Sequence, residues 1–230
     1  MNLIDLKANI LPQVDPGCSS LSDTINKLKL MKESNISKIC AAPEYYDSIN
    51  FNINDILVEI QKESSKLEGF KIPELTSGVV YPLNLDFKKI NNFESINKTA
   101  YIFCRFPSHD LNKNFSENIN SLITRNYIPI LVNIENGIVK LNKIKELKEI
   151  GCLVSVDLYL SYWSNTAKDC IRKLESDHLI DIVAGFSKFE NLKHSVIKFS
   201  EDSKINMEKL ENLYMNENPN LILESSKKQI

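Results

Sequence analysis

The chain has 230 residues, of which 43% are hydrophobic and 25% are charged, and its formal net charge is −2. This composition is typical of a globular protein and excludes a largely disordered chain. Lysines and acidic residues are interspersed along the sequence without a basic stripe or an arginine-rich segment, so we expect no nucleic-acid partner.

Seven short runs rich in apolar and β-branched residues predict strands that alternate with helical patterns. The predicted strands are residues 3–6, 38–42, 74–80, 99–104, 128–133, 152–158 and 179–184. Apolar residues at helical spacing predict helices around residues 21–31, 56–60, 119–123, 141–147 and 167–174. Ser19, Ser20 or Ser22 caps the first of these helices, and Gly151 ends the fourth.

Strands that are each followed by a helix imply parallel pairing with helical crossovers. The pattern alone does not separate a closed barrel from an open doubly wound sheet. Residues 204–223 predict one or two further helices, and residues 224–230 predict a frayed tail. No internal repeat or flexible linker divides the sequence, so we expect one α/β domain over residues 1–230.

The cysteines and the hydropathy pattern bear on the compartment. Five scattered cysteines form no C-x-x-C pair, which favours a reducing compartment over a disulfide framework. The amino terminus lacks the basic and apolar regions of a signal peptide, and no apolar run approaches the roughly 18 residues that a membrane span needs. We therefore expect a cytoplasmic protein without a membrane span.

Residues 4–17 are the most informative segment of the chain. An apolar run leads to two alternating positions, Lys7 and Asn9, and then to an Ile-Leu-Pro stop and a Val-Asp-Pro-Gly turn. Side chains two apart on a strand point to the same face, an arrangement that lets a His-x-His pair bind one metal ion. The frame resembles the amino terminus of the bacterial PHP-type protein tyrosine phosphatases of capsule and exopolysaccharide synthesis. That family typically reads D-x-H-x-H-x-L-P followed by D-D-G, so the frame is present and the histidines are not.

The ends of the next three predicted strands resemble the family in the same way. The family's A-T-P-H reads Ala-Ala-Pro-Glu here, which places Glu44 at the histidine position. A G-x-E pattern ends in Val80 in place of the glutamate. A strand that ends in E-F-P in the family has Arg105 at the position of its ligand glutamate.

The remaining motifs follow in the family's order. A segment similar to P-I-x-A-H-P-E-R has Asn133 at the histidine and keeps Glu135. The S-D-x-H after the last strand is matched by Phe186 and Lys188 at its aspartate and histidine. Residues 217–223 resemble the closing N-P helix of the family. The resemblance thus extends over nearly the whole chain.

The resemblance implies a PHP-like fold, which is a distorted seven-stranded parallel (β/α) barrel related to the TIM barrel. In such barrels the chemistry takes place at the carboxyl ends of the strands. The family uses divalent metals such as manganese or iron, and its members act on tyrosine-rich tails of polysaccharide-assembly kinases.

The departures from the family pattern remove ligands and add positive charge. A catalytic metal needs several His, Asp or Glu groups that converge at about 2.0–2.2 Å. Lys7, Arg105 and Lys188 would each place a cation where the family holds a metal ion. At an effective dielectric constant near 20, such a charge about 4 Å away repels a cation by roughly 4 kcal/mol. Val80 and Phe186 offer no ligand atom, so we expect no metal, no other cofactor and no catalytic residue.

The sequence therefore predicts a non-catalytic phosphatase homologue that acts as a binding or regulatory protein. In one interpretation, the three cations form a pocket for a phosphorylated or acidic protein tail. In the other, they pair with the carboxylates of Glu44, Glu135 and Asp157 and leave the pocket without a ligand. An active paralogue is a further candidate partner. The alternative function is an active metal-dependent tyrosine phosphatase with a remodelled site.

Overall fold

The computed structural model describes residues 2–16, 18–45, 52–106, 115–136, 139–159, 164–186 and 191–225. Within these ranges the strands pair in parallel and form two sheets. The three-stranded sheet has the order β1 (Leu3–Ala8), β2 (Ile36–Ala41) and β3 (Glu74–Ser77). The five-stranded sheet has the order β4 (Val80–Pro82), β5 (Tyr101–Arg105), β6 (Ile128–Val132), β7 (Leu153–Asp157) and β8 (Ile182–Ala184).

The third predicted strand, residues 74–80, is in fact two strands. Its first part, β3, pairs with β2, and β4 pairs with β5. Gly78 lies between them, where an added Cβ would approach the Cys40 sulfur to 3.1 Å, so the backbone passes close to β2 at this point. An α/β fold with parallel strands is confirmed. The prediction placed residues 74–80 in a single strand, whereas the described strands divide into sheets of three and five.

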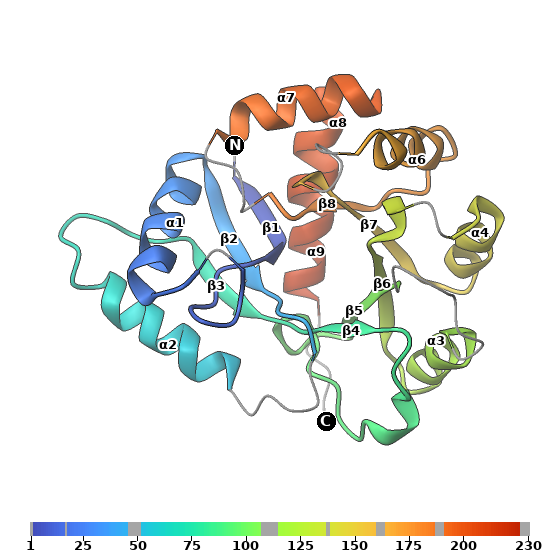
Figure 1. Cartoon of the computed structure of the whole chain (residues 1–230), viewed down its shortest axis with the longest axis horizontal. Helices are drawn as coiled ribbons and strands as arrows, with labels where there is room; N and C mark the ends of the chain where they lie inside the picture. The colour runs from blue at the N-terminus through green and yellow to red at the C-terminus, as the bar shows by residue number, and fades with distance from the viewer. Residues whose placement is uncertain are drawn as a thin grey trace.

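Helices surround the strands, as Figure 1 shows. They are α1 (Leu21–Glu33), α2 (Ile53–Ser64), α3 (Phe115–Thr124), α4 (Leu141–Glu149), α6 (Asn165–Ser176) and α7 (Leu192–Ser203). Ser20 is the cap of α1, because its hydroxyl accepts the Asp23 N–H. Gly151 follows the end of α4 with a φ of +98°, as predicted for a residue that ends a helix. Short 3₁₀ turns are η1 (Phe87–Lys89), η2 (Ile96–Lys98) and η3 (Ile134–Asn136).

The carboxyl-terminal helices close one end of the ring of strands. They are α8 (Met207–Lys209), the π-helical segment η4 (Leu210–Glu217) and α9 (Asn218–Glu224), and they run behind the strands in Figure 1. Ile222 and Leu223 of α9 pack in one buried cluster with side chains from six strands, including Ile4, Phe103 and Ile130. We call this end the floor. The predicted tail is corrected at its start, because Glu224 belongs to α9 and its carboxylate lies 3.0 Å from the Lys38 ammonium.

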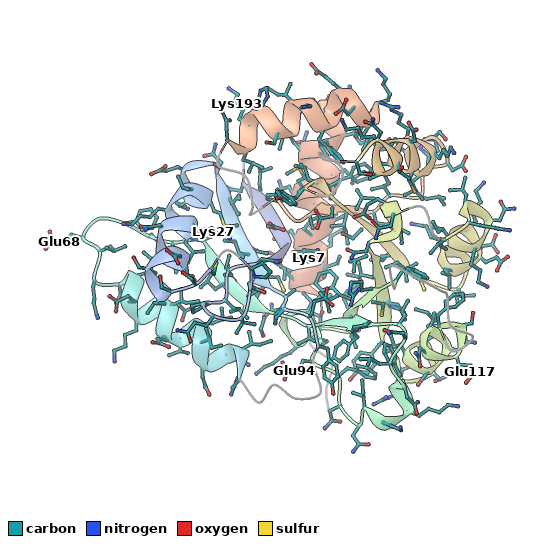
Figure 2. All side chains as sticks on the ribbon, viewed as in Figure 1. Lys7, Lys27, Glu68, Glu94, Glu117 and Lys193 are labelled. Carbon is teal, nitrogen blue, oxygen red and sulfur yellow. The ribbon has the colours of Figure 1, made fainter. Side chains whose placement is uncertain are left out.

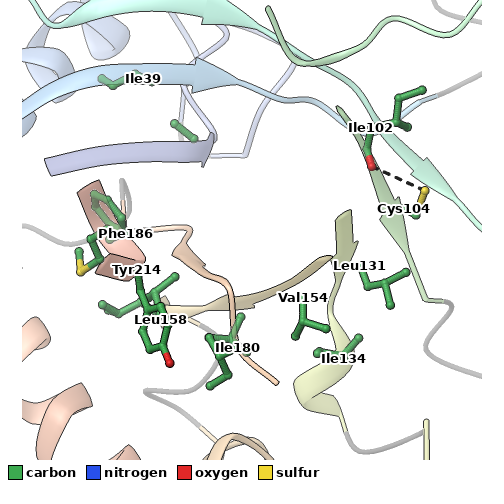
Figure 3. Close-up of a cluster of buried hydrophobic side chains, with 14 of the residues drawn as sticks. Ile39, Ile102, Cys104, Leu131, Ile134, Val154, Leu158, Ile180, Phe186 and Tyr214 are labelled. Atoms are coloured by element: carbon green, nitrogen blue, oxygen red, sulfur yellow. Dashed lines mark hydrogen bonds between the residues drawn. The ribbon is translucent and has the colours of Figure 1, made fainter. Parts of the chain in front are cut away.

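A second and larger apolar cluster lies between the strands and the outer helices. Figure 3 shows part of it, with Leu158 beside Tyr214 and with Leu131 near Ile134. The five cysteines form no disulfide, and four of them are buried. In the described part of the chain, no helix has both the length and the apolarity that a membrane crossing requires.

The first and last strands are connected through the side chain of Asp5. β1 and β8 lie in contact, and the buried Asp5 carboxylate accepts the N–H groups of Gly185 at 2.9 Å and Phe186 at 3.1 Å. It also accepts the Lys7 N–H at 3.1 Å. Burial raises the pKa of Asp5, and the N–H groups of Gly185 and Lys7 oppose that rise. Asp5 therefore joins the end of the described strand series, after β8, to its first strand, β1.

Candidate functional site

A cavity of about 260 Å³ lies at the carboxyl ends of the strands, opposite the floor. Its walls come from the ends of β1 and β7, the residues that follow β1, β2 and β6, and the start of β4. The lining residues are Lys7, Asn9, Val14, Asp15, Pro16, Ala42, Pro43, Glu44, Val80, Asn133 and Asp157. The structure therefore brings together five of the eight predicted site positions, together with Asp157 as a predicted charge partner.

Lys7 and Asp157 form an ion pair in this cavity. The distance from Lys7 Nζ to Asp157 Oδ2 is 2.9 Å, and the two side chains are only 14% and 7% exposed. Lys7 lies in Figure 2 among the strands, at the end of β1. Burial alone would lower the pKa of Lys7, but attraction and a hydrogen bond to Asp157 raise it above its ordinary value. The ammonium therefore keeps its charge inside the cavity.

Gly185 holds Asp157 in place through its lack of a side chain. Its φ is +73°, in the left-handed region, and a Cβ at this position would overlap the Asp157 carboxylate. The same glycine donates its N–H to Asp5. The backbone after β8 thus positions both carboxylates that surround Lys7.

A second ion pair lies at the edge of the cavity. Arg105 Nε at the end of β5 is 2.8 Å from Glu44 Oε2, and the two side chains are 24% and 34% exposed. Glu44 is held by a parallel bridge to Val80. Arg105 itself is not among the described lining residues. The structure thus forms two of the pairings that internal neutralisation requires.

Glu135 and Asn133 carry the acceptors that lack donors. Glu135 is fully buried, and neither of its carboxyl oxygens accepts a hydrogen bond from a described residue. The buried amide oxygen of Asn133 likewise accepts no hydrogen bond from a described residue. Burial raises the pKa of Glu135 to about 8, and the nearby negative charge of Asp157 adds to the rise. Glu135 is therefore mostly protonated at neutral pH and does not act as a full counter-charge for Lys7.

Phe186 is a predicted site position that does not join the cavity. Phe186 was expected at a former ligand position, but its side chain is 1% exposed and packs in the large apolar cluster shown in Figure 3. Only its backbone N–H contributes, as a donor to Asp5. Lys188 lies outside the described residues, so its predicted place in the pocket stays a prediction.

Asp15 is the cavity residue that sequence reasoning missed. It is 8% exposed, lines the cavity, and accepts the Leu11 N–H at 2.9 Å. The available signal was the turn after β1, which keeps the first aspartate of the family's D-D-G pattern and replaces the second with Pro16. The prediction used only the positions that differ from the family pattern, and Asp15 keeps the family's residue.

The described residues of the cavity do not form a ligand set for a divalent metal. In the ranges that the structure describes, no three His, Cys, Asp or Glu side chains form a group that could hold a metal ion. The carboxylates of Asp157 and Glu44 are each bound to a cationic side chain, and Val80 offers no donor. A metal at this position would have to displace Lys7 from Asp157 and then remain beside its positive charge.

The sequence and the fold are both similar to known proteins. A family model described as "Capsular polysaccharide synthesis, CpsB/CapC" matches residues 3–224. A Staphylococcus aureus protein named "Putative tyrosine-protein phosphatase CapC" is 23% identical over 197 residues, which cover 79% of this chain and 75% of that protein.

Two solved structures share the fold. One is a chain from the crystal structures of YwqE from Bacillus subtilis and CpsB from Streptococcus pneumoniae, which are described as metal-dependent tyrosine phosphatases. Its TM-score is 0.78 at 19% identity, over 96% of this chain and 94% of that chain. The other is a lactonase from Listeria monocytogenes, with a TM-score of 0.65 at 11% identity, over 99% and 95% of the two chains. At these identities the likeness shows the fold alone. The family model, which spans nearly the whole sequence, shows that this chain belongs to the CpsB/CapC family of capsular polysaccharide synthesis.

Proposed function

We propose that this chain is a non-catalytic member of its phosphatase-related family and acts as a binding or regulatory protein. The observation that carries the proposal is the Lys7–Asp157 ion pair, 2.9 Å long, in the cavity at the strand ends. The YwqE and CpsB proteins are described as metal-dependent, and the described donor set here does not suit a metal. A hydrolytic metal site lowers the pKa of bound water far below that of bulk water, and the described residues of this cavity supply no equivalent group.

The ligand of such a protein depends on whether the cations Lys7 and Arg105 face a ligand or pair with carboxylates of the chain. A pocket for a phosphorylated or acidic tail needs cations that face the ligand. Here Lys7 is bound to Asp157 and Arg105 to Glu44, so internal neutralisation describes the known pairs better. A protein tail, or an active paralogue in a mixed assembly, remains compatible with a regulatory role.

We also propose that the strands close into a distorted seven-stranded barrel within a single domain. In this arrangement β3 and β4 count as one broken strand, because each pairs with one neighbour of the ring. The contact between β1 and β8 and the Asp5 hydrogen bonds across it support closure. The reducing, cytoplasmic location stays a prediction from the unpaired cysteines.

The competing function is a metal-dependent phosphatase with a remodelled site, and family membership is what favours it. Elemental analysis of the purified chain and turnover of p-nitrophenyl phosphate with added Mn²⁺ separate the two. We expect substoichiometric metal and the same background rate for the natural chain and for Lys7→Ala. Stoichiometric manganese or iron with metal-dependent turnover would contradict the proposal.

A further inference from the structure

A groove of about 380 Å³ lies between the outer helices α4 and α6. The two helices are neighbours at the edge of the molecule in Figure 1, and the Lys145 ammonium, 3.0 Å from the Asp177 carboxylate, joins α4 to the cap that ends α6. The described lining residues are Val139, Lys140, Leu141, Ile144, Thr166, Asp169, Cys170 and Lys173. None of these residues also lines the cavity at the strand ends, so the groove is a separate feature of the surface.

The base of the groove is apolar. Ile144 is buried within the large apolar cluster, and Leu141 and Cys170 pack against that cluster while they stay partly exposed. These side chains leave apolar surface in contact with water inside a concave site. The volume lies within the roughly 300–1,000 Å³ that is typical of ligand pockets, so the base can accept an apolar side chain of a partner.

The cationic side chains of α4 and α6 differ in whether a carboxylate faces them. Most of them form ion pairs with described residues, namely Lys143, Lys145, Lys148, Lys168 and Arg172. Lys140, at the cap of α4, and Lys173 of α6 form no ion pair with a described residue, and both line the groove. The two helices thus direct their uncompensated positive charge to this groove.

The carboxylate among the described lining residues does not neutralise these lysines. Asp169 lies 2.8 Å from the guanidinium of Arg172 on the same helix. Lys140, Lys173 and Thr166 are exposed, and their side chains carry N–H and O–H donors. The electrostatic field of these residues over the groove therefore favours an anion.

We infer that the groove between α4 and α6 binds an acidic segment of a partner protein, whose apolar side chain enters the base and whose carboxylates face Lys140 and Lys173. Lysine ammonium groups form charge-assisted hydrogen bonds with carboxylates. The surface goes beyond the proposed function, because it does not involve the cavity at the strand ends and does not depend on whether that cavity holds a metal.

Two other anionic partners fit the groove less well. A membrane surface is recognised by clusters of about four to eight basic residues, and Lys140 and Lys173 are the two among the described lining residues. A free phosphate ion would leave the apolar base in contact with water. A peptide with acidic residues on both sides of an apolar residue satisfies both the charge and the base.

Fluorescence anisotropy on the full chain tests this surface with a fluorescein-labelled peptide of sequence Glu-Glu-Leu-Glu-Glu. A peptide with glycine in place of the leucine tests the apolar base, and one with lysines in place of the glutamates tests the charge. We expect saturable binding of the leucine peptide that weakens as salt rises. The glycine peptide binds about fivefold more weakly, and the lysine peptide shows no saturable binding.

Two variants remove the proposed contacts at exposed positions, so they leave the fold intact, which thermal denaturation checks. Lys140→Gln and Lys173→Gln each weaken binding of the leucine peptide by about threefold to fivefold, and the double variant weakens it by about tenfold. The matched control is Lys143→Gln. It removes the same charge from α4, but the Lys143 ammonium lies over the ring of Phe115 in α3, 5.8 Å from its centroid. This variant changes the affinity by less than about twofold.

Equal affinity in the natural chain and the double variant overturns the groove, and so does a loss in Lys143→Gln as large as that in Lys173→Gln. Equal binding of the leucine and glycine peptides overturns the role of the apolar base. Vesicles of phosphatidylcholine and phosphatidylserine that bind the natural chain but not the double variant, without binding of the leucine peptide, overturn the protein partner in favour of a membrane. Metal-dependent turnover of p-nitrophenyl phosphate contradicts the proposed function alone, and absence of peptide binding contradicts the groove alone.

Discussion

The two ends of the strands are stabilised by different interactions. One end is the floor, and the other, which holds the cavity, is called the mouth. At the floor, α9 seals the interior with Ile222 and Leu223, and its polar groups are paired with Lys38 and Asn97. The mouth holds two ion pairs and, in the described ranges, the buried acceptors that lack donors. Unpartnered buried groups destabilise a fold, so they persist most readily where a site is, or once was. Apolar packing therefore closes the floor, whereas ion pairs hold the mouth.

The largest expected effect comes from breaking the mouth's buried pair. Lys7→Ala removes the cation that faces Asp157 and leaves its carboxylate close to those of Asp5 and Glu135. Loss of one partner of a buried pair lowers the free energy of unfolding by about 3–5 kcal/mol. Urea denaturation measures it.

The control for that experiment is Lys88→Ala, which removes an exposed pair whose side chains are 74% and 64% accessible. It costs less than about 1 kcal/mol. Equal losses in the Lys7 and Lys88 variants would show that burial of the Lys7 pair is unimportant.

Two neighbouring residues of α9 test the floor. Ile222 is 3% exposed in the interior cluster, and Leu221 is 67% exposed. Ile222→Ala lowers the free energy of unfolding by about 2–5 kcal/mol, because it leaves a cavity in the floor. Leu221→Ala changes it by less than about 0.5 kcal/mol. Thermal denaturation of both variants checks the contrast, and similar melting temperatures would rule out α9 as the seal.

The pH dependence of stability tests the buried carboxyl at the mouth. The folded-state pKa of Glu135 is about 8, above the ordinary value of 4.5, so the folded chain binds more protons than the unfolded chain between these values. Stability is therefore complete below the ordinary pKa and falls as pH rises towards 8. The full loss is on the order of 5 kcal/mol, since each pKa unit corresponds to about 1.4 kcal/mol.

Glu135→Gln removes this titration and flattens the profile between pH 5 and pH 8. Denaturation at several pH values compares it with the natural chain. Parallel profiles would show that Glu135 is not the titrating group.

The smallest expected effect belongs to the half-exposed pair at the edge of the mouth. Glu44→Gln weakens the contact with Arg105, whose side chain is 24% exposed. Solvent screens such pairs, so the free energy of unfolding falls by only about 0.2–1 kcal/mol. Chemical denaturation in low and high salt measures the loss, which shrinks as salt rises. A loss as large as that of Lys7→Ala would remove the distinction between the two pairs.

Much of the fold follows from local patterns, because strand and helix periodicity depends on neighbouring residues. Capping chemistry alone predicted Gly151 and limited the cap of α1 to three serines, one of which is Ser20. The break between β3 and β4 was not, because it depends on the close approach of Gly78 to Cys40 in another strand. The inclusion of Glu224 in α9 likewise depends on Lys38, far away in the sequence.

The sequence predicted which residues lie at the cavity better than it predicted which side chains contact each other. The strand-end rule placed Lys7, Asn9, Glu44 and Asn133 together, and the cavity contains all four. The choice of Asp157 as the partner of Lys7 needed the path of the backbone at Gly185. The burial of Phe186 had no local signal, since its side chain turns into the apolar cluster just after β8.

The carboxylate of Asp5 has a consequence for how the chain folds. It joins backbone groups 180 positions away in the sequence, and no shorter segment can form those contacts. Contacts of such sequence separation are entropically expensive to make early, so they form late and slow the approach to the native state. We therefore expect the contact between β1 and β8 through Asp5 to form late in folding.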